Sequence, residues 1–168
     1  MNHFPLLLAL ALAAGVNRPA FAADMSGHDQ HHAQTAGTGK PSASTLDSRP
    51  LVKFPEPLRI QTLANMRDHL STMGAIQDAL ARGSFDQASD LAERRLGMSS
   101  LDMHGAHEVA MYMPKGMQDA GTTMHRTASR FAIAAKDASA TGDLRAALAS
   151  LATLNQTCVA CHAAYRIH

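Results

Sequence analysis

The chain has 168 residues, of which 46% are hydrophobic and 4% aromatic; it has no tryptophan and a formal net charge of +1. A near-neutral balance without a basic run excludes the electrostatic footprint of a protein that binds nucleic acid or an anionic membrane. The length suits one domain with a buried core, and a composition rich in Ala, Leu and Met favours helices packed on one another.

Residues 1–22 have the pattern of a cleavable signal peptide. The run from Phe4 to Ala14 is apolar apart from one proline, and it is too short to span a bilayer. Ala20 and Ala22 supply small residues where a signal peptidase requires them, although no Lys or Arg precedes the apolar run. We expect cleavage after Ala22, export to the periplasm and no stable membrane span afterwards; a retained anchor is the alternative.

Residues 23–50 are rich in Gly, Ser, Thr, Gln and His and contain hardly any large apolar side chain. Such a segment cannot bury enough apolar surface to offset the entropy of ordering, so we predict a flexible leader. Four of its side chains are soft or borderline metal donors: Met25, His28, His31 and His32. Two interpretations stay open, a polar tether and opportunistic binding of copper or zinc.

Residues 51–168 are predicted to form one all-α domain. The first helix is expected over 56–81, between two prolines and Gly83, and the second begins at Ser84 as N-cap and ends at Gly97. The first helix carries apolar residues at three-to-four spacing, the pattern of a helix-packing seam: Leu63, Met66, Leu70, Met73 and Leu80. The less regular stretch 98–113 contains Gly105 and is expected to hold a short helix.

Two further helices follow. The third is predicted from Pro114 to about Ser139, and the fourth begins at Asp143 after the Thr141-Gly142 break. One face of the third is apolar: Met117, Met124, Phe131 and Ala135. One face of the fourth joins leucines to the tail of the chain: Leu144, Leu148, Leu151, Leu154, Cys158, Cys161 and Tyr165. No segment predicts a strand, and an antiparallel four-helix bundle accommodates this pattern.

The tail of the fourth helix reads Cys158-Val159-Ala160-Cys161-His162. Thiols at this spacing, followed by an imidazole, attach haem c covalently: each thiol adds across one vinyl group, and His162 becomes the proximal iron ligand. These are the only cysteines, so no other disulfide partner competes. A redox dithiol prefers the start of a helix, and a structural zinc needs a second ligand pair. We therefore expect one covalent haem, with dithiol and zinc as the alternatives.

The C-terminus resembles that of the cytochrome c′ family, the class II c-type cytochromes. Its ending has the family's Cys-x-x-Cys-His-x-x-Tyr-Arg form, in Cys158, Cys161, His162, Tyr165 and Arg166. The first helix is similar to the family's haem-facing helix at four positions: Arg67, Leu70, Met73 and Gly74. The resemblance covers residues from about 58 to the end. It implies a four-helix bundle, electron exchange with partner proteins, and compatibility with a homodimer packed through the first two helices.

The resemblance divides into two chemistries according to the sixth iron position. A methionine ligand implies a low-spin electron carrier, whereas an apolar cover implies a five-coordinate haem that binds NO. Met66 is our first choice as ligand, with Met73 and His69 as alternatives, and Leu70 is a candidate apolar cover. A methionine on a helix seam is also a common core filler.

Two residues beyond the motif are candidate neighbours of the haem. Arg166 lies one turn beyond His162 and is expected either to orient that ligand, to pair with a propionate, or to remain a solvated terminal arginine. Tyr165 is expected to pack on the porphyrin edge.

A second Met/His concentration lies between 98 and 125. His104 and His107 are three residues apart, and several thioethers and one further imidazole lie nearby: Met103, Met111, Met113, Met117, Met124 and His125. Such donors suit Cu(I). The other interpretation is that the methionines pack the bundle, while the histidines lie on its surface or hydrogen-bond a helix end. The predicted function is periplasmic electron transfer without substrate turnover, since no acid–base pair or nucleophile stands out. NO binding at a five-coordinate haem and copper handling are the alternatives.

Overall fold

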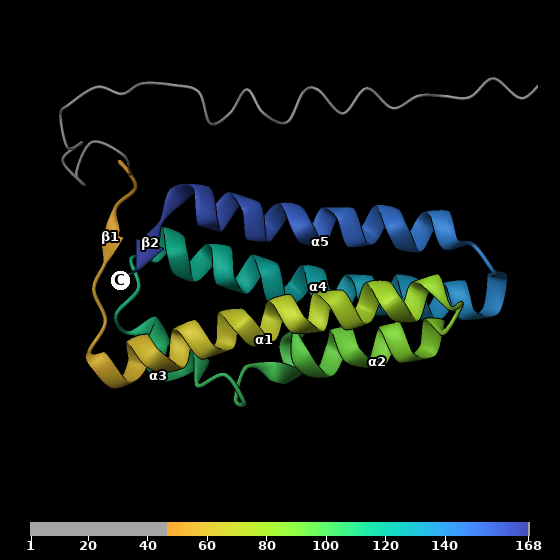
Figure 1. Cartoon of the computed structure of the whole chain (residues 1–168), viewed down its shortest axis with the longest axis horizontal. Helices are drawn as coiled ribbons and strands as arrows, with labels where there is room; N and C mark the ends of the chain where they lie inside the picture. Colours follow the sequence, from red (N-terminus) through yellow and green to blue (C-terminus); the bar gives the residue numbers. More distant parts are fainter. Residues whose placement is uncertain (1–46, 168) are drawn as a thin grey trace, which may run out of the picture. The chain divides into compact units, whose positions relative to one another are not determined.

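A computed structural model describes residues 47–167 of the chain. The predicted signal peptide, residues 23–46 of the leader with Met25, His28, His31 and His32, and His168 lie outside the described residues. Within 47–167 the chain is predominantly helical, with five α-helices, one 3-10 turn and two very short strands, so the all-α prediction is confirmed (Figure 1). No helix in this part of the chain is both long and apolar enough to cross a membrane.

The first two long helices begin and end close to the positions expected. Helix α1 spans Glu56–Ala81 and has Pro55 as N-cap and a second proline in its first turn, where the missing N–H costs nothing. The chain then reverses at Gly83, whose φ of 71° is a left-handed conformation that favours glycine. Helix α2 spans Phe85–Arg95, with Ser84 at its N-cap.

The irregular stretch holds a 3-10 turn, η4 (Met98–Ser100), and a short helix, α3 (Ala106–Ala110), as predicted for 98–113. Helix α4 spans Lys115–Thr141 and ends at Gly142, whose φ is 74°. Helix α5 spans Leu144–Ala164 and is capped by Asp143, whose side chain accepts a hydrogen bond from the N–H of Ala146 at 3.2 Å.

Consecutive long helices pack side by side: α1 on α2, α2 on α4, and α4 on α5. The core between them combines the fully buried Phe131, Ile76 and Leu154 with a set of alanines that have no exposed surface: Ala79, Ala88, Ala92, Ala128, Ala135 and Ala147. Small side chains let helix backbones approach closely, so few aromatic residues are needed to fill the core. The predicted buried face of α4 is confirmed at Met117, Met124, Phe131 and Ala135.

The first and last long helices, α1 and α5, run in opposite directions and do not pack on each other along their lengths (Figure 1). The predicted seam of α1 is therefore only partly buried. Met73 and Leu80 belong to the core, but Leu70 is 75% exposed, because the buried face of α1 is turned toward α2 and centres on Ile76. The spacing alone predicts an apolar stripe; it does not say which part of that stripe a neighbour covers.

The prediction that no segment forms a strand is wrong at the two ends of the domain. Strand β1 (Leu51–Val52) pairs in parallel with β2 (Arg166–Ile167), Leu51 opposite Arg166 and Val52 opposite Ile167. Two residues are too few to show an alternating pattern in the sequence, so this pairing has no sequence signal. It ties the chain before α1 to the chain after α5.

Candidate functional site

The three residues of the predicted haem motif lie in the last two turns of α5. The side chains of Cys158 and Cys161 are half-buried, and His162 is exposed. Cys158 packs against the apolar core, and the two cysteines form no disulfide with each other. Positions separated by three and four residues share a helix face, so Cys158, Cys161 and His162 point to the same side of α5.

Burial raises the pKa of both thiols, and the neighbouring Cys158 raises that of Cys161 further. The motif also lies at the C-terminal end of a helix, where the helix dipole disfavours a thiolate. Redox dithiols need the opposite environment, a helix N-terminus or a neighbouring cation that lowers the pKa. The geometry therefore disfavours the dithiol alternative.

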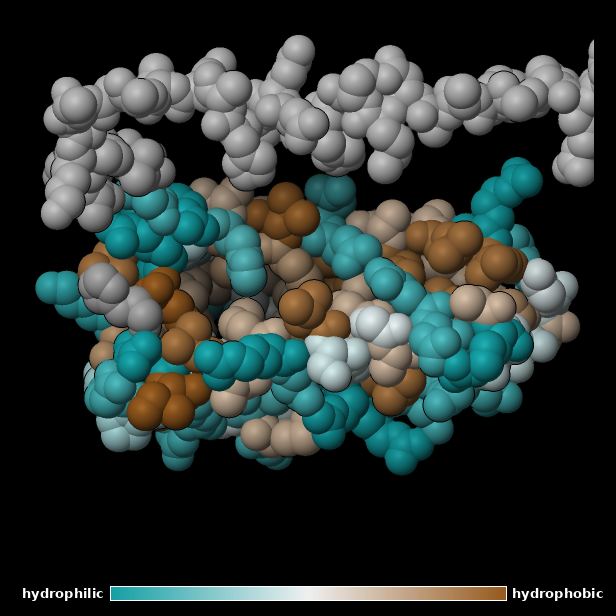
Figure 2. Space-filling model, in the orientation of Figure 1, coloured by the Kyte–Doolittle hydropathy of each residue, from teal (hydrophilic) through white to brown (hydrophobic). Residues whose placement is uncertain are grey.

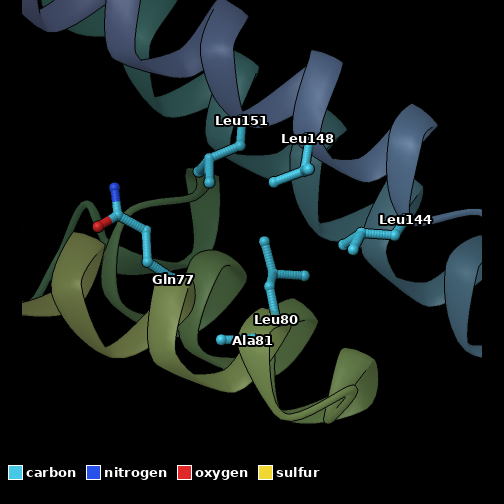
Figure 3. A pocket seen from close by; sticks show the side chains of 6 residues that line it. All are labelled: Gln77, Leu80, Ala81, Leu144, Leu148 and Leu151. Atoms are coloured by element: carbon cyan, nitrogen blue, oxygen red, sulfur yellow. The ribbon is translucent and has the colours of Figure 1, made fainter. Parts of the chain in front are cut away.

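An apolar groove runs between α1 and α5. Figure 3 shows its walls, with Leu80 of α1 reaching toward Leu144 and Leu148 of α5. The remaining lining residues are Gln77, Ala81 and Leu151, and the open volume is about 230 Å³. In the space-filling view the surface is hollowed further along the same side, between α1 and α5, with apolar side chains at the bottom (Figure 2).

The register of the two helices relates Met66 to the haem motif. Leu80 and Leu148 lie across the groove from each other. Because α1 and α5 are antiparallel and rise equally per residue, a step of 14 residues, about 21 Å, along each leads to Met66 and His162. Met66 is half-buried, and Leu70 follows one turn later on the same side of α1. Met66, the first-choice iron ligand, therefore lies within one helical turn of the level of His162.

The alternatives on α1 have different environments. Met73 is 8% exposed and belongs to the core cluster. The imidazole of His69 lies against two other histidine rings, with its centroid 4.7 Å from that of His104. Burial is the main cause that lowers the pKa of His69, to about 4, and the charges of the neighbouring histidines lower it further.

The segment before α1 holds the end of α5. Arg49 donates hydrogen bonds from Nη1 to the carbonyl oxygens of His162 and Tyr165, the latter at 3.3 Å, and its Nη2 pairs with Asp47 Oδ2 at 2.6 Å. This hydrogen bond to Arg49 holds the pKa of Asp47 well below its usual range. Arg166 in turn donates from Nε to the carbonyl oxygen of Arg49 at 3.0 Å.

The sequence did not single out Asp47 and Arg49. They lie in a polar stretch that we predicted as leader, and no local pattern reveals a hydrogen bond to a residue more than 100 positions away. Arg166, for which three roles were left open, is half-buried beside them, with Nε 4.0 Å from Asp47 Oδ2. Tyr165 lies against the first turn of α4. Its hydroxyl is so close to Gly116 that a Cβ added to this glycine would lie 2.5 Å from it.

The residues proposed for a copper site do not share one environment. His104 is 5% exposed, whereas His107 is exposed on α3. The methionines are likewise divided, with Met103 and Met111 exposed and Met117 and Met124 buried. The ring contacts of His104 are with His69 and His125, so the structure groups residues that spacing along the chain did not.

Comparisons of the chain with protein-family models, with curated proteins and with solved structures find no match. The resemblance to the cytochrome c′ family thus stays a prediction, and function is argued from the residues and their arrangement.

Proposed function

We propose that the protein is a periplasmic c-type cytochrome, an antiparallel four-helix bundle that carries electrons through one covalently attached haem. The single observation that supports this most is that Cys158, Cys161 and His162 share one face in the last turns of α5, a helix that does not pack on α1 along its length. Haem held there supplies a one-electron Fe(III)/Fe(II) couple.

The residues have separate roles in this proposal. Cys158 and Cys161 form the thioether bonds, and His162 provides the proximal imidazole. Arg49 fixes the backbone of His162 through its carbonyl oxygen, which limits movement of the ligand's main chain. Apolar side chains of α1 and α5, among them Leu70, exclude water from the haem. These side chains are exposed in the chain without haem, and the bound haem would cover them.

Met66 is the proposed sixth ligand, because it lies at the level of His162 on the opposite wall. Thioether ligation opposite an imidazole stabilises the reduced state and raises the potential, which suits an electron carrier. Arg166 and Asp47 contribute fixed charges beside the motif, and both are close enough to the end of α5 to influence the potential.

Leu70 supports a second candidate function. It is apolar, 75% exposed, and lies one turn from Met66 on the open side of α1. With Leu70 rather than Met66 over the sixth position, the protein would bind NO at a five-coordinate haem.

An absorption spectrum of the ferric protein distinguishes the two functions. Electron transfer with Met66 ligation predicts a weak methionine-to-iron band at the red end of the spectrum. Met66→Ala should abolish that band, and Met73→Ala, a change in the core on the same helix, should leave it in place. A high-spin ferric spectrum with rapid NO binding in the unaltered protein would reject the electron-carrier function in favour of gas binding.

A further inference from the structure

Three histidines from separate segments meet between α1, α4 and the loop before α3. The ring centroid of His69 lies 4.7 Å from that of His104 and 6.0 Å from that of His125, and the centroids of His104 and His125 are 5.8 Å apart. All three side chains lie largely away from solvent, His104 at 5% and His125 at 8% exposure. We propose that these three histidines bind a divalent first-row transition-metal ion, at a site separate from the haem motif.

Three ring nitrogens of this cluster have no hydrogen-bond partner. Among the described residues, His69 Nε2 and both ring nitrogens of His104 are buried without a hydrogen bond. Buried polar atoms are nearly always satisfied in folded proteins, so three orphaned atoms in adjacent rings need an explanation. A metal ion that accepts one lone pair from each ring would satisfy His69 Nε2 and one of the two nitrogens of His104.

The third histidine already has the hydrogen bond that prepares an imidazole for ligation. His125 Nδ1 lies 2.7 Å from the carbonyl oxygen of Leu96. A carbonyl only accepts, so Nδ1 carries the proton and the lone pair is on Nε2. Metal-bound histidines typically hold their second nitrogen in this way.

The spacing of the rings matches a tris-imidazole site. A metal–nitrogen bond of about 2.0–2.1 Å places each ring centroid roughly 3.2 Å from the ion, and tetrahedral angles then separate the centroids by about 5 Å. The observed separations, 4.7 to 6.0 Å, are within about 1 Å of that value. No three His, Cys, Asp or Glu side chains among the described residues already surround one point where an ion could bind. Loading therefore requires the rings of His69 and His104 to turn, and the soft χ2 torsion of histidine permits this.

The backbone that carries His104 is well held. Its carbonyl oxygen accepts hydrogen bonds from Gln61 Nε2 at 3.1 Å and Asn65 Nδ2 at 2.9 Å, both from α1. Gly105 follows in a left-handed conformation with φ of 60°, and a Cβ there would collide with the amide of Gln61. The loop is thereby fixed against the helix that supplies His69, which preorganises two of the three ligands.

The imidazoles of the cluster are in the form that binds metals. Burial lowers the pKa of all three histidines, so at neutral pH each is in the neutral form that binds metals. Asp68 Oδ2 lies 3.9 Å from His104 Nε2 and also pairs with Arg95. Its carboxylate supplies a negative charge beside His104, which the positive charge of Arg95 partly offsets. Imidazole ligands suit Zn²⁺, Cu²⁺ and Ni²⁺ and not Mg²⁺ or Ca²⁺, and we choose Zn²⁺ as the probe.

The experiment is a calorimetric titration of the exported holoprotein with Zn²⁺ near pH 7.5. The chain carries His28→Ala, His31→Ala and His32→Ala, so that leader histidines do not contribute. We expect one Zn²⁺ per chain, and at least about tenfold weaker binding after His104→Ala. The matched control is His107→Ala, an exposed histidine three residues away, which should bind as the parent does.

A second measurement needs no change in the cluster and so holds even if His104→Ala does not fold. X-ray absorption at the zinc edge of the loaded parent protein should show three imidazole nitrogens at about 2.0–2.1 Å. Absence of stoichiometric uptake, or Zn²⁺ bound without imidazole, would overturn the proposal. So would a His69→Ala change that alters the haem spectrum in metal-free buffer, because His69 would then be an iron ligand. The proposed electron-transfer function is judged by the haem spectrum alone and survives a failed zinc titration.

Discussion

Arg49 donates a hydrogen bond to the carbonyl oxygen of His162, a residue 113 positions further along the chain. The bond joins the segment before α1 to the turn of α5 that carries the predicted axial ligand. The adjacent β1–β2 pairing and the hydrogen bond from Arg166 N to the carbonyl oxygen of Pro50, at 3.1 Å, reinforce the connection. The end of α5 is therefore stabilised by tertiary contacts, where an isolated helix end would fray.

Removing the Arg49 side chain should loosen the end of α5. In Arg49→Ala we expect faster hydrogen exchange at the amides of Tyr165 and Arg166, because the carbonyl oxygens of His162 and Tyr165 lose their donor. Arg82→Ala is the control, since Arg82, the C-cap of α1, forms a local ion pair with Asp78, one turn earlier. Unchanged exchange rates in Arg49→Ala would show that the strand pairing alone holds the helix end.

Phe131 should be the most costly apolar side chain to truncate. It is fully buried at the centre of the core, so Phe131→Ala is expected to lower the free energy of unfolding by about 3–5 kcal/mol. Ile133→Ala, two residues away but 63% exposed, should change it by about 0.5 kcal/mol or less. Denaturant unfolding measures both, and comparable losses would contradict the orientation of α4 described above.

The close packing of α2 on its neighbouring helices depends on alanine. Ala88 has no exposed surface, and Ala88→Leu should destabilise the protein by roughly 1–3 kcal/mol, because the added carbons have no space between the helices. Ala140→Leu makes the same change at an exposed position near the end of α4 and should be close to neutral. Thermal unfolding provides the comparison; a stable Ala88→Leu protein would mean that the helices are further apart than we find.

Two glycine-to-alanine changes should have opposite signs. Gly105→Ala places a Cβ in a left-handed residue and against the Gln61 amide, and should destabilise by about 1–2 kcal/mol. Gly121→Ala, inside α4 with open space around the added carbon, should stabilise by about 0.5–1 kcal/mol. Chemical unfolding of both variants tests the local geometry; an equal response at the two sites would contradict it.

The sequence predicted the helices well because their boundaries carry strong local signals. Pro55 sets the start of α1, Ser84 that of α2, and Gly142 ends α4. The apolar periodicity of α4 also identified its buried face, since that helix is packed along its length. On α1 the same reasoning placed Leu70 on the seam, yet it is exposed, because the gap toward α5 depends on how the last helix packs and not on local spacing.

The two candidate sites also differ in how far local sequence predicts them. Cys158, Cys161 and His162 are close together in the chain, so the sequence alone was enough to propose a haem motif there. The convergence of His69 with His104 and His125 is not readable from the sequence, because it requires three segments to meet. Sequence proximity grouped His104 and His125 with the exposed His107 and left His69 out.

The most direct test of the central claim is the intact mass and colour of the chain after export from a host with a haem-attachment apparatus. We predict a polypeptide starting at Ala23, heavier by one haem, with the absorption of haem c retained after denaturation and acid extraction. A double change, Cys158→Ala with Cys161→Ala, should remove the added mass. A colourless unaltered chain with the mass of the polypeptide alone would contradict the proposed function.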